Sequence, residues 1–293
     1  MKYAWIQDNV VVFPVIMMCR VLEVSTSGFY AWRMRGPSTR QVRHALFADA
    51  VEKSHAASRH AYGYRKVHED ILEAFEEPCC KETVRMIMKN KGLRAKRARK
   101  FTHTTDANHT YAVADNLLNR EFDAEYPNEK WVADITYIPT REGWSYLAAV
   151  MDLYGRRIVG WATSKHIDTA LVSDALHAAI RERQPGAGLL HHSDRGVQYA
   201  SNDYQQTLDL FDITCSMSRK GNCWDNACME RFFSSLKSEW IGDTIYPTHE
   251  AATTAIFEYI DVFYNSKRRH QALGYKTPIQ YENETQNTEA LAA

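Results

Sequence analysis

Residues 130–165 read KWVADITYIPTREGWSYLAAVMDLYGRRIVGWATSK, and this stretch decides the fold. It is rich in β-branched and aromatic residues and is interrupted only at residues 141–143 and 155–156. This composition predicts three strands, Lys130–Thr140, Trp144–Tyr154 and Arg157–Lys165. Because turns this short join only antiparallel neighbours, the three strands should form an antiparallel meander.

Helices and strands alternate after this meander. Asp168 is the predicted N-cap of a helix that runs to Arg183. The later elements are a buried strand over 189–192, a helix over 201–211, a strand over 213–218 and a helix from about residue 226. Parallel strands need helical crossovers, and this order provides them. The order predicts an α/β core of the ribonuclease H-like fold, with a mixed five-stranded sheet and flanking helices.

Three acidic residues fall at particular places in this order. Asp134 lies inside the first strand, Asp194 directly follows the fourth, and Glu230 lies on the helix after the fifth, with thirty-five residues between the last two. Each alone has an ordinary structural explanation, such as a turn for Asp194. However, a carboxylate within an apolar strand is unusual. Three converging carboxylates repel one another unless cations join them, and oxygen ligands suit Mg²⁺ or Mn²⁺. Two ions would clamp the attacking and leaving oxygens of a phosphodiester.

The chain before these strands is helical and basic. Residues 1–110 hold 19 Lys and Arg against 11 Asp and Glu, a net charge of +8, whereas the whole chain has a net charge of zero. Residues 81–90 place Val84, Ile87 and Met88 on one side of a predicted helix and basic residues on the other. A basic run follows at 94–100. Short helices of this kind resemble a helix-turn-helix that contacts DNA phosphates, although a solvated basic face explains the charge as well.

Composition sets the remaining limits. The chain has 293 residues, 45% hydrophobic and 25% charged, which excludes a wholly disordered protein. Its six cysteines form no Cys-x-x-Cys pair, and its longest apolar run is too short for a membrane span. We therefore expect a cytoplasmic protein with no membrane association. The expected units are an N-terminal helical region (1–40), a helix-turn-helix domain (41–100), a linker (101–125), the catalytic core (126–240) and a helical C-terminal extension (241–293).

Several motifs together resemble one known family. They are WVADITY at 131–137, HSDRGVQY at 192–199, GNCWDNACMERFF at 221–233, YGYRK at 62–66 and RRH at 268–270. The sequence resembles the DDE transposases of bacterial insertion sequences, of the OrfB type related to retroviral integrases. The resemblance extends over nearly the whole chain.

This resemblance implies an enzyme that cleaves DNA strands and transfers them at the ends of an insertion sequence, with Mg²⁺ or Mn²⁺ as cofactor. It implies that Asp134, Asp194 and Glu230 hold two metal ions. Lys237 follows Glu230 by seven residues, nearly two helical turns, and should reach the scissile phosphate from the same face. The implied DNA-contacting residues are Tyr64, Arg65, Lys66, Lys81, Arg85, Lys89, Arg94, Lys96, Arg97, Arg99, Lys100, Arg195, Asn226, Arg231, Asn265, Arg268, Arg269 and His270.

The implied partners are the element ends, the target DNA and further copies of the chain assembled on DNA. The chain acts either alone or with an upstream-frame partner protein, or fused to that partner. Two other functions fit the acidic residues or the helices less completely. One is a ribonuclease H-type nuclease that only hydrolyses, which would need neither the basic front nor the C-terminal arginines. The other is a non-catalytic DNA-binding regulator, which would not need the three carboxylates.

Overall fold

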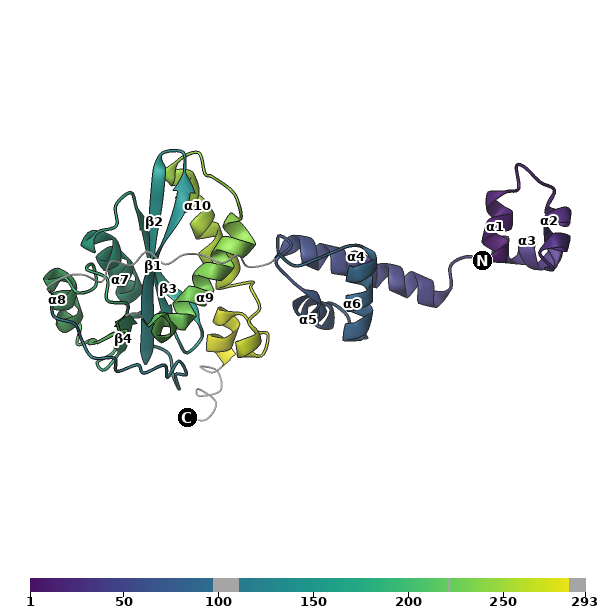
Figure 1. Cartoon of the computed structure of the whole chain (residues 1–293). Coiled ribbons are helices and arrows are strands. Elements are labelled where there is room, and N and C mark those ends of the chain that lie inside the picture. Colours follow the sequence, from purple (N-terminus) through teal and green to yellow (C-terminus); the bar gives the residue numbers. More distant parts are fainter. Residues whose placement is uncertain (97–110, 221, 285–293) are drawn as a thin grey trace.

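A computed structural model of the chain describes residues 1–96, 111–220 and 222–284. Figure 1 shows α1–α3 at one end of the molecule, α4–α6 in the middle, and the sheet with its helices at the other end. In the described ranges, no helix combines the length and apolar character needed to cross a membrane. The first helices are α1 (Lys2–Asp8), α2 (Val15–Val21), α3 (Thr26–Met34), α4 (Thr39–Ala57), α5 (Tyr64–Ala74) and α6 (Lys81–Asn90).

The sheet confirms the predicted mixed, five-stranded ribonuclease H-like core. Its strands are β1 (Lys130–Thr140), β2 (Gly143–Asp152), β3 (Arg157–Ser164), β4 (Leu190–Ser193) and β5 (Thr214–Met217). Their order across the sheet is β3-β2-β1-β4-β5. The first three strands are antiparallel, as their short turns require, whereas β4 runs parallel to β1 and β5 parallel to β4. The long strand β1 therefore lies at the centre of the sheet.

Helical segments follow the strands. They are α7 (Thr169–Arg183), α8 (Asn202–Leu210), the short η1 (Cys223–Asn226), α9 (Ala227–Ser235), the π-helical η2 (Leu236–Ile241), α10 (His249–Phe257), the π-helical η3 (Glu258–Tyr264) and the short η4 (Gln271–Leu273). The predicted cap of α7 is confirmed, because the Asp168 carboxylate accepts a hydrogen bond from the Leu171 amide at 3.0 Å. The two strands parallel to β1 each follow a helical crossover, as expected.

The alternation of side chains along β1 separates two apolar cores. Trp131 and Ala133 pack on one face of the sheet with α7 and α8, and Val132 and Ile138 pack on the other face with α9. Because successive strand residues point to opposite faces, Asp134 shares the face of Val132. This alternation places the carboxylate of Asp134 on the face of the sheet that α9, the helix with Glu230, covers.

The helices α4–α6 share the second of these cores. The predicted apolar side of α6 is confirmed, since Val84, Ile87 and Met88 are buried, and they belong to the same cluster as Phe232 of α9. The predicted linker is also anchored where the structure describes it. Leu118 is buried against this core, and residues 101–110 lie outside the described part of the chain. The helices α4–α6 therefore pack on the sheet unit, whereas α1–α3 form a small core of their own around Ile6 and Phe29.

Candidate active site

Three elements bring the predicted carboxylates to one place. The parallel register pairs Val132 of β1 with His192 of β4, and its continuation by two residues brings Asp134 beside Asp194. Glu230 lies in the first turn of α9, which packs on the same face of β1. Burial raises the pKa of Asp134 well above its ordinary value, and the negative charges of Asp194 and Glu230 raise it further. The three acidic groups are thus within electrostatic reach of one another.

The backbone orients two of these carboxylates. Asp134 Oδ1 accepts a hydrogen bond from the Ile135 amide at 2.8 Å, and Asp194 Oδ1 accepts one from the Gly196 amide at 2.9 Å. A Cβ atom at position 196 would lie 3.0 Å from that same Asp194 oxygen. Glycine therefore favours this close approach, because a larger residue would need the carboxylate to move by a few tenths of an ångström.

Lys237 lies near this site and also contacts β1 directly. The seven-residue argument assumes one continuous α-helix, but α9 ends at Ser235 and the chain continues as a π-helix. The ammonium of Lys237 lies 4.3 Å from the centre of the Tyr137 ring on β1. Burial lowers the pKa of Lys237, and the charge of Asp134 opposes this shift. Lys237 therefore belongs to the electrostatic environment of Asp134 because of its contact with β1.

The residues just before α9 hold that helix to the sheet. Asn226 Nδ2 donates a hydrogen bond to the carbonyl of Ala133 at 3.0 Å, next to Asp134. Asp225 is fully buried and accepts hydrogen bonds from the Arg219 and Arg120 guanidinium groups. Hydrogen bonds to these arginines hold the pKa of Asp225 well below its ordinary value. The sequence does not reveal the two arginine partners of Asp225, because Arg120 lies 105 residues before it.

The donor chemistry of the site fits a hard divalent cation. Asp134, Asp194 and Glu230 offer carboxylate oxygens, and their mutual repulsion is what a cation would relieve. The nearby Asn226 Oδ1 is buried and accepts no hydrogen bond from any described residue. Within residues 1–96, 111–220 and 222–284, no group of three or more His, Cys, Asp or Glu side chains is already arranged to hold a metal ion.

Several of the predicted DNA-contacting residues are accessible. Lys81, Arg85 and Lys89 are exposed on α6, opposite its buried side. Arg65, Arg94, Lys96 and Arg231 are also exposed, and Tyr64 is half-buried. Arg195 is half-buried, and its Nε donates to the carbonyl of Ser218 at 2.5 Å. Arg97, Arg99 and Lys100 lie outside the described residues.

Other expected DNA contacts are engaged within the chain. The buried Asn265 bonds both the amide and the carbonyl of Ile158, and Asn226 is buried as described above. Arg268 pairs with Glu239, Arg269 pairs with two acids of α5, and His270 is buried beside Tyr264. The ammonium of Lys66 lies over the Tyr62 ring, and burial lowers its pKa to about 8.

Comparisons with known proteins agree with this architecture. Residues 124–223 and 211–278 match two family models described as integrase core domain, and residues 42–101 match an HTH-like domain. The chain is 40% identical over 285 residues to the transposase InsF for insertion sequence IS3A of Escherichia coli, covering 97% of this chain and 99% of that protein. It is also 40% identical over 264 residues to an uncharacterized 31 kDa protein of insertion element IS600 from Shigella sonnei, covering 90% of this chain and 97% of that protein.

Among solved structures, the chain is similar to a protein in the simian T-cell lymphotropic virus intasome. The TM-score is 0.47 at 16% sequence identity, over 79% of this chain and 74% of that chain. The InsF likeness extends over both the helical and the sheet units. The chain therefore belongs to the family of insertion-sequence transposases that includes InsF, enzymes built on an integrase core domain.

Proposed function

We propose that Asp134, Asp194 and Glu230 form the catalytic site of this transposase and that they act with Mg²⁺ or Mn²⁺. The observation that carries the proposal is the convergence of three carboxylates from β1, from the end of β4 and from α9. Burial and the charges of the other two carboxylates raise the pKa of Asp134. A structural role would not explain three like charges at one place. Membership of the family supports DNA as the substrate, and the placement of the three carboxylates supports this site.

The reaction proposed here has two stages. In cleavage, water adds across a phosphodiester, the bond from phosphorus to the 3′ oxygen breaks, and a 3′-hydroxyl and a 5′-phosphate result. In strand transfer, that 3′ oxygen forms a bond to a phosphorus of the target strand while the target's own bond to a 3′ oxygen breaks. Both stages need negative charge on the phosphate to be stabilised, which is the usual task of cations in such sites.

The residues of the chain divide this work. Asp134, Asp194 and Glu230 would hold two divalent ions, which polarise the phosphate and lower the pKa of attacking water when bound. Lys237 would bind a phosphate oxygen, since an ammonium donates hydrogen bonds but cannot ligate a metal. Asn226, through the Ala133 carbonyl, holds α9 against β1.

The decisive experiment changes each carboxylate separately in the full-length protein. Asp134→Asn, Asp194→Asn and Glu230→Gln should each abolish cleavage and joining of a duplex that carries the ends of the encoding element, in Mg²⁺ and in Mn²⁺. End binding in a gel shift should survive, because the three groups contribute little attraction to DNA. The matched control is Asp174→Asn, an exposed carboxylate of α7. Retained joining in any one of the three variants would remove that residue from the site.

We also propose that the exposed face of α6 contacts end DNA. Lys81, Arg85 and Lys89 are spaced four residues apart on one side of the helix, opposite its buried face. Replacing all three with Ala should weaken end binding and make it less dependent on salt, because the protein then neutralises fewer phosphates and releases fewer counterions when it binds. An unchanged salt slope would show that α6 lies away from the DNA.

A further inference from the structure

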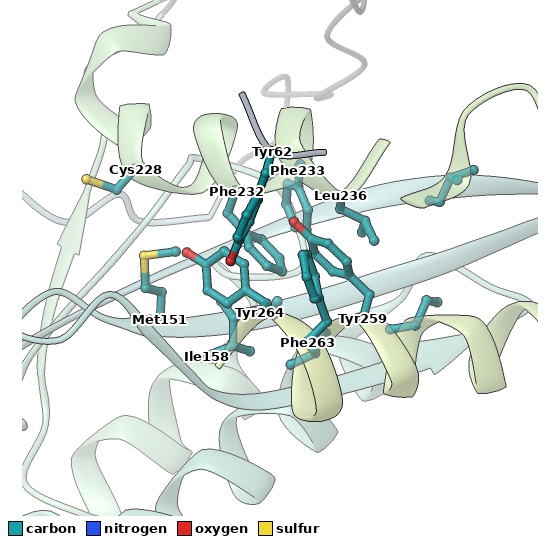
Figure 2. Close-up of a cluster of buried hydrophobic side chains, with 14 of the residues drawn as sticks. Tyr62, Met151, Ile158, Cys228, Phe232, Phe233, Leu236, Tyr259, Phe263 and Tyr264 are labelled. Atoms are coloured by element: carbon teal, nitrogen blue, oxygen red, sulfur yellow. The ribbon is translucent and has the colours of Figure 1, made fainter. Parts of the chain in front are cut away.

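The segment 62–66 leads into α5, and Tyr62 at its start packs against the sheet unit and the C-terminal extension. Tyr62 is 4% exposed. Its hydroxyl donates to the carbonyl of Lys267 at 2.9 Å and accepts from the amide of Arg269 at 2.9 Å. Figure 2 shows its ring among aromatic side chains that include Phe232 of α9 and Phe263 of η3. The Tyr62 side chain is therefore not available to DNA.

Ion pairs reinforce this contact from the C-terminal side. The Arg269 guanidinium, 11% exposed, bonds Asp70 at 2.6 Å and Glu73 at 2.5 Å, and both acids lie on α5. One arginine of the C-terminal extension thus holds two successive turns of the helix that precedes α6. Two separate hydrogen bonds from a planar guanidinium fix direction as well as distance.

The opposite end of the contact reaches the π-helix that carries Lys237. The Lys96 ammonium donates to the carbonyl of Glu239 at 2.9 Å, and the Arg59 guanidinium lies 3.6 Å from the centre of the Trp240 ring. The Glu239 side chain is in turn paired with Arg268. The helical unit therefore contacts Glu239 and Trp240 of η2, within three residues of Lys237. Because η2 directly continues α9, these contacts also bear on the helix that carries Glu230.

We infer that these contacts form a rigid joint that sets the distance between the DNA sequence held by α4–α6 and the carboxylates, and so determines which phosphodiester is cut. We call the contacts of Tyr62, Asp70, Glu73 and Arg269 the joint. Arg269 and Tyr62 are then positioning residues, which act through the placement of α9 and η2 and do not touch DNA. The inference rests on the proposed function, because it takes the cut to occur at Asp134, Asp194 and Glu230.

The test removes polar contacts of the joint and keeps the buried apolar side chains. Tyr62→Phe keeps the buried ring and removes only the hydroxyl, and Asp70→Asn with Glu73→Gln removes both acids that bind Arg269. The matched control is Glu52→Gln, which removes one ion pair, with Lys91, inside the helical unit. Full-length proteins are compared on end duplexes in Mg²⁺, with binding measured by gel shift and every cut mapped to the nucleotide on a denaturing gel.

The joint variants should bind end DNA within about twofold of wild type, cut it at least tenfold more slowly, and spread their cuts over phosphodiesters next to the native one. Arg269→Lys, which keeps the charge but not the double contact, should fall between wild type and Arg269→Gln. Cuts confined to the native position would overturn the inference, as would equal losses of binding and cutting. If Asp134→Asn still cuts, the proposed site fails instead, and the two failures are thereby distinguished.

Discussion

Glu239 accepts two hydrogen bonds from the Arg268 guanidinium, at 2.7 Å from Nε and 2.6 Å from Nη2, and both side chains are about nine-tenths buried. The pair joins η2 to the C-terminal extension. It lies nine residues beyond Glu230 on the same helical run, so it supports the helix that carries a proposed catalytic carboxylate. Its energetics can be tested apart from any DNA chemistry.

Removing one member of this pair should destabilise the protein. Glu239→Ala leaves the Arg268 charge buried without its acid, a change that typically costs about 3–5 kcal/mol of the free energy of unfolding. Replacing both residues with Met should cost less than Glu239→Ala alone, because no charge is then stranded. Urea unfolding followed by circular dichroism measures both values. A double variant less stable than the single variant would contradict this account.

Lys237→Ala should slow cutting and joining about 10²-fold or more, as expected when one cationic group is removed from a site of developing charge. The concentration of Mg²⁺ that gives half-maximal activity should stay unchanged, because an ammonium does not ligate metal. Single-turnover assays on end duplexes provide both quantities, with the exposed Lys165→Ala as control. A strong shift in the Mg²⁺ requirement would show that Lys237 instead sets the positions of the carboxylates.

Asp134→Asn should make the metal-free protein more stable while it abolishes activity. The pKa of Asp134 is raised in the folded protein, so the folded state holds this proton more tightly than the unfolded chain. Ionisation therefore opposes folding once the pH rises above the unfolded-state pKa near 4. At neutral pH the neutral amide should add about 0.5–2 kcal/mol.

Mg²⁺ should make wild type more stable than Asp134→Asn, which reverses the order of stability expected without metal. Binding to the folded state raises the melting temperature of wild type with increasing Mg²⁺ concentration, whereas Asp134→Asn should respond weakly. Thermal melts with EDTA and across a Mg²⁺ series test both statements. A wild type that is more stable than the variant in EDTA would show that the Asp134 charge is already compensated without metal.

Two buried histidines should make the protein less stable in mild acid. Burial lowers the pKa of His191 to about 3 and that of His192 to about 4. Both side chains are neutral in the folded protein. The ring nitrogens of His192 form hydrogen bonds with the hydroxyls of Ser216 on β5 and of Ser218 just after it. The unfolded chain binds their protons below about pH 6.5, so stability is complete above that pH and falls as the pH drops toward 4.

The slope of this loss is testable by substitution. Near pH 5 each histidine contributes up to about 1.4 kcal/mol per pH unit, so His191→Gln should reduce the slope of unfolding free energy against pH by up to that amount. His177→Gln, at an exposed position of α7, is the matched control. An unchanged slope in His191→Gln would mean that His191 takes up its proton without unfolding.

The sequence by itself determined the order of the helices and strands and the elements on which the three carboxylates lie. Strand composition, turn length and the Asp168 cap are local properties, so 130–165 reads as a meander without reference to the rest of the chain. The parity of Asp134 within β1 likewise follows from local geometry, although which helix covers that face does not. The family motifs identified the acidic residues because their spacing follows this local order.

Only the tertiary structure decided what the basic and aromatic motifs do. Arg268, Arg269 and Lys66 have the composition of a DNA-binding surface. However, Arg269 pairs with Asp70, 199 residues away, Arg268 pairs with Glu239, and the ammonium of Lys66 lies over the Tyr62 ring. Charge in a sequence does not reveal whether a side chain meets solvent, phosphate or a distant carboxylate. The contact of Lys237 with Tyr137 on β1 is likewise tertiary, because it joins residues one hundred positions apart that no local pattern brings together.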